Sequence, residues 1–344
     1  MAGEYRFSFG PWNIHEGGDP FGPTVRTTIK FAKKLKLFKK LGFEGVQFHD
    51  DDAVPEMNEL GPKEIVKKAK EVRKMLADEG LVAEFVAPRL WEDPRTIDGG
   101  YTSNDPECRK YARDRSRRAI DIAAALKTDL IVLWLAREGT YMREAKDSKV
   151  AVDRLVKAID DMLAYNKDIK IAIEPKPNEP MDQAYIPTTG HAMALGYLTR
   201  DAGRVGVNIE TAHAILAGLD PSDEMGFALA YDKLYTVHLN DQNGLKFDED
   251  KSFGSVNLRR AFNQVRILDK YDYGKKGEFV GLDVKAVRTQ KQKVATKHLS
   301  NSRTIFLRLV ELARSLDERH VESLIAERDY EELDLLIMNH LLGK

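Results

Sequence analysis

The chain has 344 residues, of which 42% are hydrophobic and 32% charged, and its 54 Lys and Arg residues nearly balance its 55 Asp and Glu residues. A net charge this close to zero argues against a surface built to bind nucleic acid or an anionic membrane. A single cysteine, Cys108, excludes a disulfide framework, and with no signal-peptide core or long apolar span we expect a soluble cytoplasmic protein.

Short apolar runs alternate with longer segments of helical periodicity along most of the chain. The runs predict eight strands, at residues 5–10, 45–50, 81–88, 129–136, 170–175, 204–210, 233–240 and 279–285. The longer segments predict helices at residues 24–41, 62–79, 106–127, 146–166, 188–201, 221–231, 256–270 and 296–316. Glycine follows directly after several of these segments, as expected where a helix ends.

Continuous apolar strands joined by helices indicate a parallel sheet that is covered on both faces. Eight such units predict a (β/α)8 TIM barrel over residues 1–316, followed by a short C-terminal helical tail at 317–344. An open doubly wound sheet is the alternative, but no glycine-rich phosphate loop follows the first strand. Apolar positions in the tail must pack on the barrel or cross to a second subunit. The basic run 33–40 is expected to be the solvated face of the first helix.

The strand at 170–175 ends in Glu174 and leads into a Pro-Lys-Pro turn that presents Lys176. The flanking prolines hold both residues extended. An unpaired charge at the end of a buried strand is costly, so we expect a divalent cation beside Glu174 and a polar ligand beside Lys176. A plain ion pair between the two side chains is the alternative.

In a parallel barrel the chemistry lies at the carboxyl ends of the strands. Seven oxygen and imidazole ligands fall at these ends or in one adjoining loop: Glu174, Glu210, His213, His238, Asp248, Asp250 and Asp283. Each alone has an ordinary explanation as a turn acid or a core histidine. Together they are too many for one ion and favour two divalent cations that share Glu210. His49 and Asp52 form a second candidate pair, an aspartate-oriented histidine that moves a proton.

These residues lie in stretches that resemble the xylose isomerase family over residues 5–316. The longest matches are AIEPKPNEP (172–180) and HLNDQNGLKFDED (238–250). Others are FSFGPW (7–12), GGDPFG (17–22), GVQFHDDD (45–52), DGGYTSND (98–105), REG (137–139), PTTGHA (187–192), VNIETAH (207–213) and LDVKAVRT (282–289).

The resemblance implies a role for each matching residue. His49, held by Asp52, is similar to the ring-opening histidine, and Lys176 to the lysine that polarises the carbonyl oxygen of the sugar. The first metal would be held by Glu174, Glu210 and Asp283, and the second by Glu210, His213, Asp248 and Asp250. Trp12 and Trp134 resemble the apolar walls around the open sugar, and Phe21 the aromatic that a neighbouring subunit inserts.

Three departures from the family pattern affect the site. His238 replaces a strand-seven aspartate, which favours Mn²⁺ or Co²⁺ over Mg²⁺ and is similar to the metal sets of rhamnose isomerases and ketose 3-epimerases. Trp91 stands where the family has a phenylalanine wall, and Ala87 where it has a threonine. Leu135-Ala136 replaces a Gly-Gly pair. The tail is also shorter than the family's C-terminal arm.

The resemblance implies a metal-dependent aldose–ketose isomerase that acts on a free monosaccharide, with D-xylose to D-xylulose as the default. The reaction would proceed by ring opening and a 1,2-hydride shift, assisted by two ions of Mn²⁺, Mg²⁺ or Co²⁺ per subunit. Alternatives are an isomerase of another free sugar such as L-rhamnose, a keto-sugar epimerase, and a non-catalytic sugar-binding barrel. We expect a homodimer or homotetramer, with no nucleic-acid or membrane partner.

Overall fold

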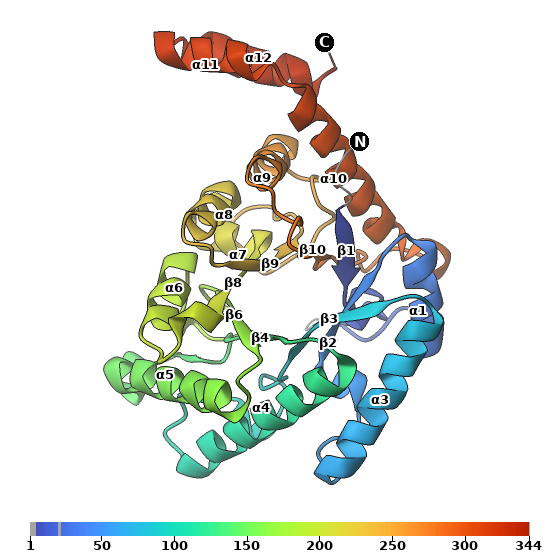
Figure 1. Ribbon diagram of the computed structural model, residues 1–344, viewed down its shortest axis with the longest axis vertical. Helices are drawn as coiled ribbons and strands as arrows, with labels where there is room; N and C mark the ends of the chain where they lie inside the picture. The colour runs from blue at the N-terminus through green and yellow to red at the C-terminus, as the bar shows by residue number, and fades with distance from the viewer. Residues whose placement is uncertain (1–4, 20–21, 344) are drawn as a thin grey trace.

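The computed structural model describes residues 5–19 and 22–343. Eight parallel strands close into a barrel in the order β1-β10-β9-β8-β6-β4-β3-β2 (Figure 1). The strands are β1 Arg6–Phe9, β2 Gly45–His49, β3 Val82–Ala87, β4 Leu130–Trp134, β6 Lys170–Glu174, β8 Val205–Glu210, β9 Leu234–Leu239 and β10 Phe279–Leu282. Because β1 pairs with both β2 and β10, the sheet is closed, and the predicted TIM barrel is confirmed.

The major helices surround the barrel as the helical periodicity predicts (Figure 1). They are α1 Phe31–Lys40, α3 Pro62–Asp78, α4 Pro106–Leu126, α5 Ser148–Tyr165, α6 Thr189–Tyr197, α8 Pro221–Ala230, α9 Leu258–Lys270 and α10 Lys297–Ser315. Two short helices, α2 Asp50–Ala53 and α7 Thr211–Leu216, follow directly on β2 and β8.

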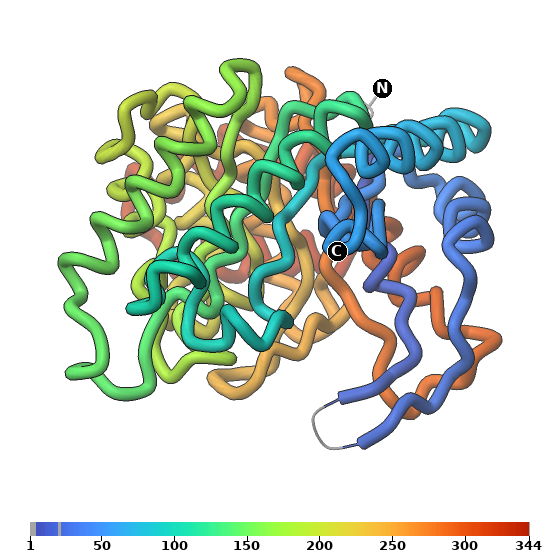
Figure 2. Tube along the Cα trace, turned by 90° about the horizontal axis from the view of Figure 1, so that it is seen from below, coloured from blue at the N-terminus to red at the C-terminus, as the bar shows by residue number. Residues whose placement is uncertain are grey.

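The first helix begins at Phe31, so the prediction that it extends back to residue 24 is wrong. The reason is a tertiary contact of Arg26, whose buried guanidinium donates to the backbone oxygens of Val287 (3.1 Å) and Gln290 (2.9 Å). These bonds hold the segment before α1 in an extended course along the loop after β10. Figure 2 shows the two stretches side by side, blue beside orange.

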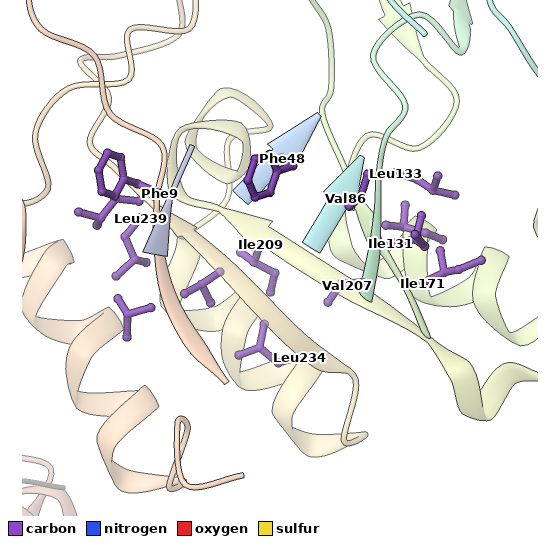
Figure 3. Packing of buried hydrophobic residues seen from close by; sticks show 14 of the residues in the cluster. Phe9, Phe48, Val86, Ile131, Leu133, Ile171, Val207, Ile209, Leu234 and Leu239 are labelled. Carbon is purple, nitrogen blue, oxygen red and sulfur yellow. The ribbon is translucent and has the colours of Figure 1, made fainter. Parts of the chain in front are cut away.

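The main hydrophobic core lies between the outer faces of the strands and the helices (Figure 3). Phe7 packs edge-on against Phe306 of α10, with ring centroids 5.4 Å apart, and Phe9 packs against Phe38 of α1. A smaller cluster fills the barrel interior and consists of Phe85, Ala87, Val132 and Ala172. Three of these four side chains are small, which leaves interior space for polar groups.

Strand β3 carries one extra residue relative to β2. Val46 pairs with Ala83, but Phe48, two residues on, pairs with Val86, three residues on. Such a bulge changes the alternation of side chains along the strand. As a result Phe85 joins the interior cluster while Glu84 also forms hydrogen bonds to interior residues of β1 and β9.

A small antiparallel pair, β5 Gly139–Thr140 and β7 Gln183–Ala184, joins the loops after β4 and β6. The phenol of Tyr141 donates to the backbone oxygen of Pro180 at 2.6 Å and ties the same two loops together. The turn that carries Lys176 is therefore held from the side by the loop after β4.

The C-terminal tail forms two helices, α11 Glu318–Glu327 and α12 Tyr330–Leu341, which extend beyond the end of α10 (Figure 1). Arg266 of α9 pairs with Glu318 at 2.7 Å, and Arg259 pairs with Asp334. Val321 and Leu324 are buried, whereas Ile325 and Leu335 remain about half exposed. Within the described residues no helix is both long and apolar enough to cross a membrane.

Candidate metal centre and sugar pocket

Seven acidic and histidine side chains meet at the carboxyl end of the barrel. They form three groups whose ligand atoms lie within 4.8 Å of one another, and Glu210 belongs to all three. The groups are Glu174, Glu210 and His213; Glu210, His238 and Asp283; and Glu210, Asp248 and Asp250. All seven predicted ligand residues are thus brought together. They come from the ends of β6, β8, β9 and β10, from α7 and from the loop after β9.

Several ligand atoms in this cluster are buried and have no hydrogen-bond partner among the described residues. They are Nδ1 of His213, both ring nitrogens of His238 and Oδ1 of Asp248. Buried polar atoms are normally satisfied, because leaving one unpaired costs about 1–3 kcal/mol. Imidazole nitrogens and carboxylate oxygens suit a divalent cation. The residues therefore fit a metal ion, and the cluster could bind one.

The ionisable groups of the cluster perturb one another strongly. Burial would lower the pKa of both imidazoles, but the Glu210 carboxylate raises the pKa of His213 to about 10, and Glu174 raises the pKa of His238 to about 9. Burial raises the pKa of Glu210 to about 7, against the opposing charge of His213. The clustered carboxylates thus favour protonated imidazoles in the metal-free site. A bound cation would neutralise the same negative charge and leave the imidazoles free to act as ligands.

Neutral amides hold three of these carboxylates in place, a role that was not predicted for them. Asn208 donates to Glu174 at 2.7 Å, Asn240 donates to Glu210 at 2.7 Å, and Asn13 donates to Asp283 at 3.0 Å. Outer hydrogen bonds of this kind orient metal ligands. Asn13 and Asn240 follow strand ends, which is the signal in the sequence that points to them, whereas Asn208 lies within β8.

Lys176 lies beside this cluster and is buried. Its Nζ donates to Asp248 at 2.9 Å, is 3.1 Å from Glu179, and lies 5.2 Å from the centroid of the Trp134 ring. Burial would lower the pKa of Lys176, but Asp248 and the neighbouring glutamates raise it, so the ammonium stays charged. The lysine pairs with these two acids in place of Glu174, so the alternative of a plain Glu174–Lys176 ion pair is wrong.

On the opposite side of the rim, His49 Nδ1 lies 2.8 Å from Asp52 Oδ2. The imidazole ring lies 4.2 Å from the ring of Trp12 and 5.0 Å from that of Trp91, centroid to centroid. Trp91 in turn packs edge-on against Trp134 at 4.6 Å. The three tryptophans thus line one apolar wall, in which the His49 ring lies between Trp12 and Trp91. Phe21, the remaining aromatic predicted for the pocket, lies outside the described residues.

Arg89, at the end of β3, belongs to this site although its residue type gave no such indication. Its guanidinium contacts His49 Nδ1 and lies 3.2 Å from both Asp52 and Asp51. Burial would raise the pKa of Asp52, but the charges of His49 and Arg89 and the hydrogen bonds from His49 lower it to about 2. Asp52 therefore remains a carboxylate that orients His49.

The sequence profile of the xylose isomerase-like TIM barrel family matches residues 35–273, so the chain belongs to this family. Solved structures with the same fold include D-psicose 3-epimerase in the presence of D-fructose, at TM-score 0.64 and 16% identity, covering 89% of this chain and 99% of that one. The 3-keto-D-glucoside 4-epimerase from E. coli matches at TM-score 0.63 and 15% identity, covering 88% and 100%. The IOLI protein with a bound zinc atom matches at TM-score 0.61 and 14% identity, covering 89% and 98%.

Proposed function

We propose that this protein is a metal-dependent aldose–ketose isomerase that acts on a free monosaccharide, with D-xylose to D-xylulose as the default reaction. The observation that carries the proposal is the cluster of three ligand groups sharing Glu210, with Lys176 on one side and the His49–Asp52 pair on the other. The family supports a sugar-modifying enzyme, and the combination of these residues favours isomerisation.

Two divalent cations per subunit are proposed, one held by Glu174, Glu210, His238 and Asp283 and the other by Glu210, His213, Asp248 and Asp250. When bound, the cations polarise the two sugar oxygens between which the proton must move. His238 supplies a neutral nitrogen where the resemblance leads us to expect an anionic oxygen. It therefore favours Mn²⁺ or Co²⁺ over Mg²⁺.

The chain's own residues would divide the remaining work. His49, with Nδ1 engaged by Asp52, is left with Nε2 for proton transfer at the ring oxygen. Lys176, fixed by Asp248 and Glu179, is positioned to donate to the carbonyl oxygen of the open sugar. Trp12, Trp91 and Trp134 would exclude water, which a hydride shift between C1 and C2 requires.

The same proposal includes a homodimer or homotetramer in which Phe21 completes a neighbouring site. Size-exclusion chromatography with light scattering measures the assembly, and F21A tests the contribution across subunits. If the protein is monomeric and fully active, this part of the proposal fails.

The experiment that tests the function is a grid of substrates and metals on metal-free protein. D-xylose, D-glucose, L-arabinose, D-ribose and L-rhamnose are each incubated with Mg²⁺, Mn²⁺ or Co²⁺. The best substrate is then repeated with deuterium at C2. Label retained at C1 supports the hydride shift, whereas label lost to solvent indicates an enediol route. No conversion of any aldose would reject the isomerase.

A keto-sugar epimerase is the second candidate. It is favoured by the Glu210, His238 and Asp283 group and by the epimerases among the solved structures of similar fold. Against it stands Lys176, because epimerisation at C3 needs a carboxylate on each face of the carbon and has no use for an ammonium beside Glu174. Incubating D-fructose, D-psicose and D-tagatose in deuterated water distinguishes the two, since only an epimerase exchanges the hydrogen at C3.

A further inference from the structure

The barrel interior contains a buried carboxyl group that the proposed reaction does not use. The extra residue in β3 directs Glu84 inward, where Oε2 accepts from Ser8 Oγ on β1 and Oε1 accepts from Thr236 Oγ1 on β9 at 2.6 Å. Glu84 is 7% exposed and forms no ion pair with any described lysine, arginine or histidine. Burial raises the pKa of Glu84, against hydrogen bonds from Ser8 and Thr236 that lower it. A buried carboxyl held by neutral groups is costly to ionise, so it invites a functional explanation.

Gln47 of β2 extends this group. Its Nε2 donates to Ser8 Oγ at 3.2 Å, while its Oε1 is buried and has no hydrogen-bond partner among the described residues. We call Ser8, Gln47, Glu84 and Thr236 the polar floor. Thr236 and His238 are two residues apart on β9 and therefore face the same side of the strand. The polar floor thus lies one layer below His238 in the barrel.

Gly281 brings the polar floor into contact with His238. It pairs with Ser8 of β1 on one side and with His238 of β9 on the other. A Cβ atom at this position would lie 2.5 Å from Gln47 Nε2 and 3.2 Å from His238 Cδ2, so the missing side chain makes room for both groups. Gln47 and His238 thus both border Gly281, and Cδ2, the His238 atom that lies there, is bonded to Nε2.

The two edges of the His238 ring therefore face different surroundings. Nδ1 lies 3.4 Å from Glu174 and 4.0 Å from Asp283, on the side of the metal centre. Nε2 is buried and has no hydrogen-bond partner among the described residues, and neither has the nearby Gln47 Oε1. A histidine that binds metal through one nitrogen generally donates its other N–H to an acceptor, which fixes the tautomer and the orientation of the ring.

We propose that the polar floor is the acceptor for the Nε2–H of His238, with Glu84 and Gln47 as positioning residues that keep Nδ1 free for the metal. Glu84 accepts from Ser8, which in turn accepts from Gln47, and this chain holds Gln47 so that an acceptor oxygen or a buried water faces Nε2. This inference rests on the proposed role of His238 as a metal ligand. It depends neither on the identity of the sugar nor on the reaction.

The test measures metal binding and the histidine tautomer directly. Metal-free protein is titrated with Co²⁺, whose visible spectrum reports its ligands, for the wild type, E84M, E84Q, Q47M and H238Q. Removing an outer partner of a metal ligand commonly weakens binding about 10- to 100-fold, so we expect this loss in E84M and a smaller one in E84Q and Q47M. E144Q, which alters an exposed carboxyl in the loop after β4, is the control and should bind Co²⁺ as the wild type does.

Nitrogen-15 NMR of histidine-labelled, metal-free protein gives a readout that a purely structural role would not change. The spectra are recorded at about pH 10, where His238 is neutral because its pKa in the metal-free protein is about 9. The His238 signal, assigned by its loss in H238Q, should show the proton on Nε2 in the wild type and a mixture of tautomers in E84M. If E84M does not fold, E84Q and Q47M carry the test, with circular dichroism as the check on folding.

The possible outcomes distinguish the metal-binding role of His238 from the role of the polar floor. If H238Q binds Co²⁺ as tightly as the wild type, the proposed metal-binding role of His238 fails. If H238Q binds weakly while E84Q and Q47M keep the affinity and the tautomer of the wild type, the role of the polar floor is overturned and the metal centre stands.

Discussion

The indole Nε1 of Trp12 donates a hydrogen bond to Asp283 Oδ1 at 2.9 Å. The same ring stacks on His49, with centroids 4.2 Å apart. One side chain thus fixes a proposed metal ligand through its polar edge and the proposed ring-opening histidine through its face. Trp12 therefore links the metal-ligand cluster to the His49–Asp52 pair.

The first prediction follows from this double contact. W12F keeps an aromatic face against His49 but loses the donor to Asp283. Hydrogen bonds to charged groups contribute about 1.5–3 kcal/mol, so we expect Mn²⁺ to bind about tenfold more weakly or worse. Isothermal titration of metal-free protein measures the change. W91F, on the same wall, serves as the control, and equal losses in both variants would contradict the role assigned to the Trp12 N–H.

The second prediction concerns ring opening. D52N removes the charge that orients His49, and general acid–base catalysis typically contributes about 10²–10⁴-fold, so we expect kcat to fall within that range. Because ring opening would then limit turnover, the kinetic isotope effect of deuterium at C2 should approach one. A large loss of kcat that retains the full isotope effect would place Asp52 in the hydride step instead.

The third prediction concerns the pH dependence of stability. Burial lowers the pKa of His298 to about 4, against a backbone hydrogen bond to Asn13 that raises it. In the unfolded chain this histidine has its ordinary pKa of about 6.5, so the unfolded chain takes up a proton at a higher pH than the folded chain does. The free energy of unfolding therefore falls as the pH drops from about 6.5 towards 4. At pH 5 the loss attributable to this histidine is about 2 kcal/mol.

The measurement compares the wild type with H298Q by urea denaturation at pH 7 and pH 5, in the presence of a chelator. The glutamine amide retains a donor for Asn13 but does not titrate. H298Q should therefore lose less stability than the wild type between the two pH values. Parallel losses in both proteins would show that His298 is not responsible.

The fourth prediction concerns Glu138, whose buried carboxylate accepts four hydrogen bonds from the loop after β3. The donors are the backbone N–H groups of Gly100, Tyr101 and Thr102 and the hydroxyl of Thr102, at 2.6–2.9 Å. E138Q converts one oxygen into a donor that faces other donors. We expect a loss of about 2–4 kcal/mol in stability, measured by thermal denaturation. The exposed E144Q is the control, and a similar small effect in both would contradict the anchoring role.

The barrel and the metal cluster could be predicted because both depend on local pattern. Apolar runs and helical periodicity define the eight units, and closure of a parallel barrel then brings the strand ends to one rim. For this reason Glu174 and Asp283, each more than 30 residues from Glu210 in the sequence, both have a ligand atom within 4.8 Å of a Glu210 oxygen. The loop after the seventh predicted strand supplied Asp248 and Asp250, whose spacing lets both carboxylates reach one metal.

Features that depend on strand register or on the direction of a long side chain could not be predicted from the sequence. Arg89 reaches His49 from a neighbouring strand, and no local pattern gives the direction of so flexible a side chain. Glu84 faces inward only because β3 has an extra residue, a register shift that alternation alone does not reveal. The late start of α1 likewise reflects Arg26 binding backbone oxygens more than 250 residues away.

The last prediction tests why a histidine stands at position 238. H238D restores the carboxylate that the resemblance leads us to expect and adds one negative charge to a cluster already rich in them. Oxygen ligands suit Mg²⁺, whereas imidazole nitrogen favours transition metals, so the ratio of Mg²⁺ to Co²⁺ affinity should rise in H238D. Competition titrations of metal-free protein measure this ratio, with H238N as the control for size without the added charge. If H238D and H238N shift the ratio equally, charge is not the determinant. If neither shifts it, His238 does not set the choice of metal, and the selectivity must come from the group around His213 and Asp248.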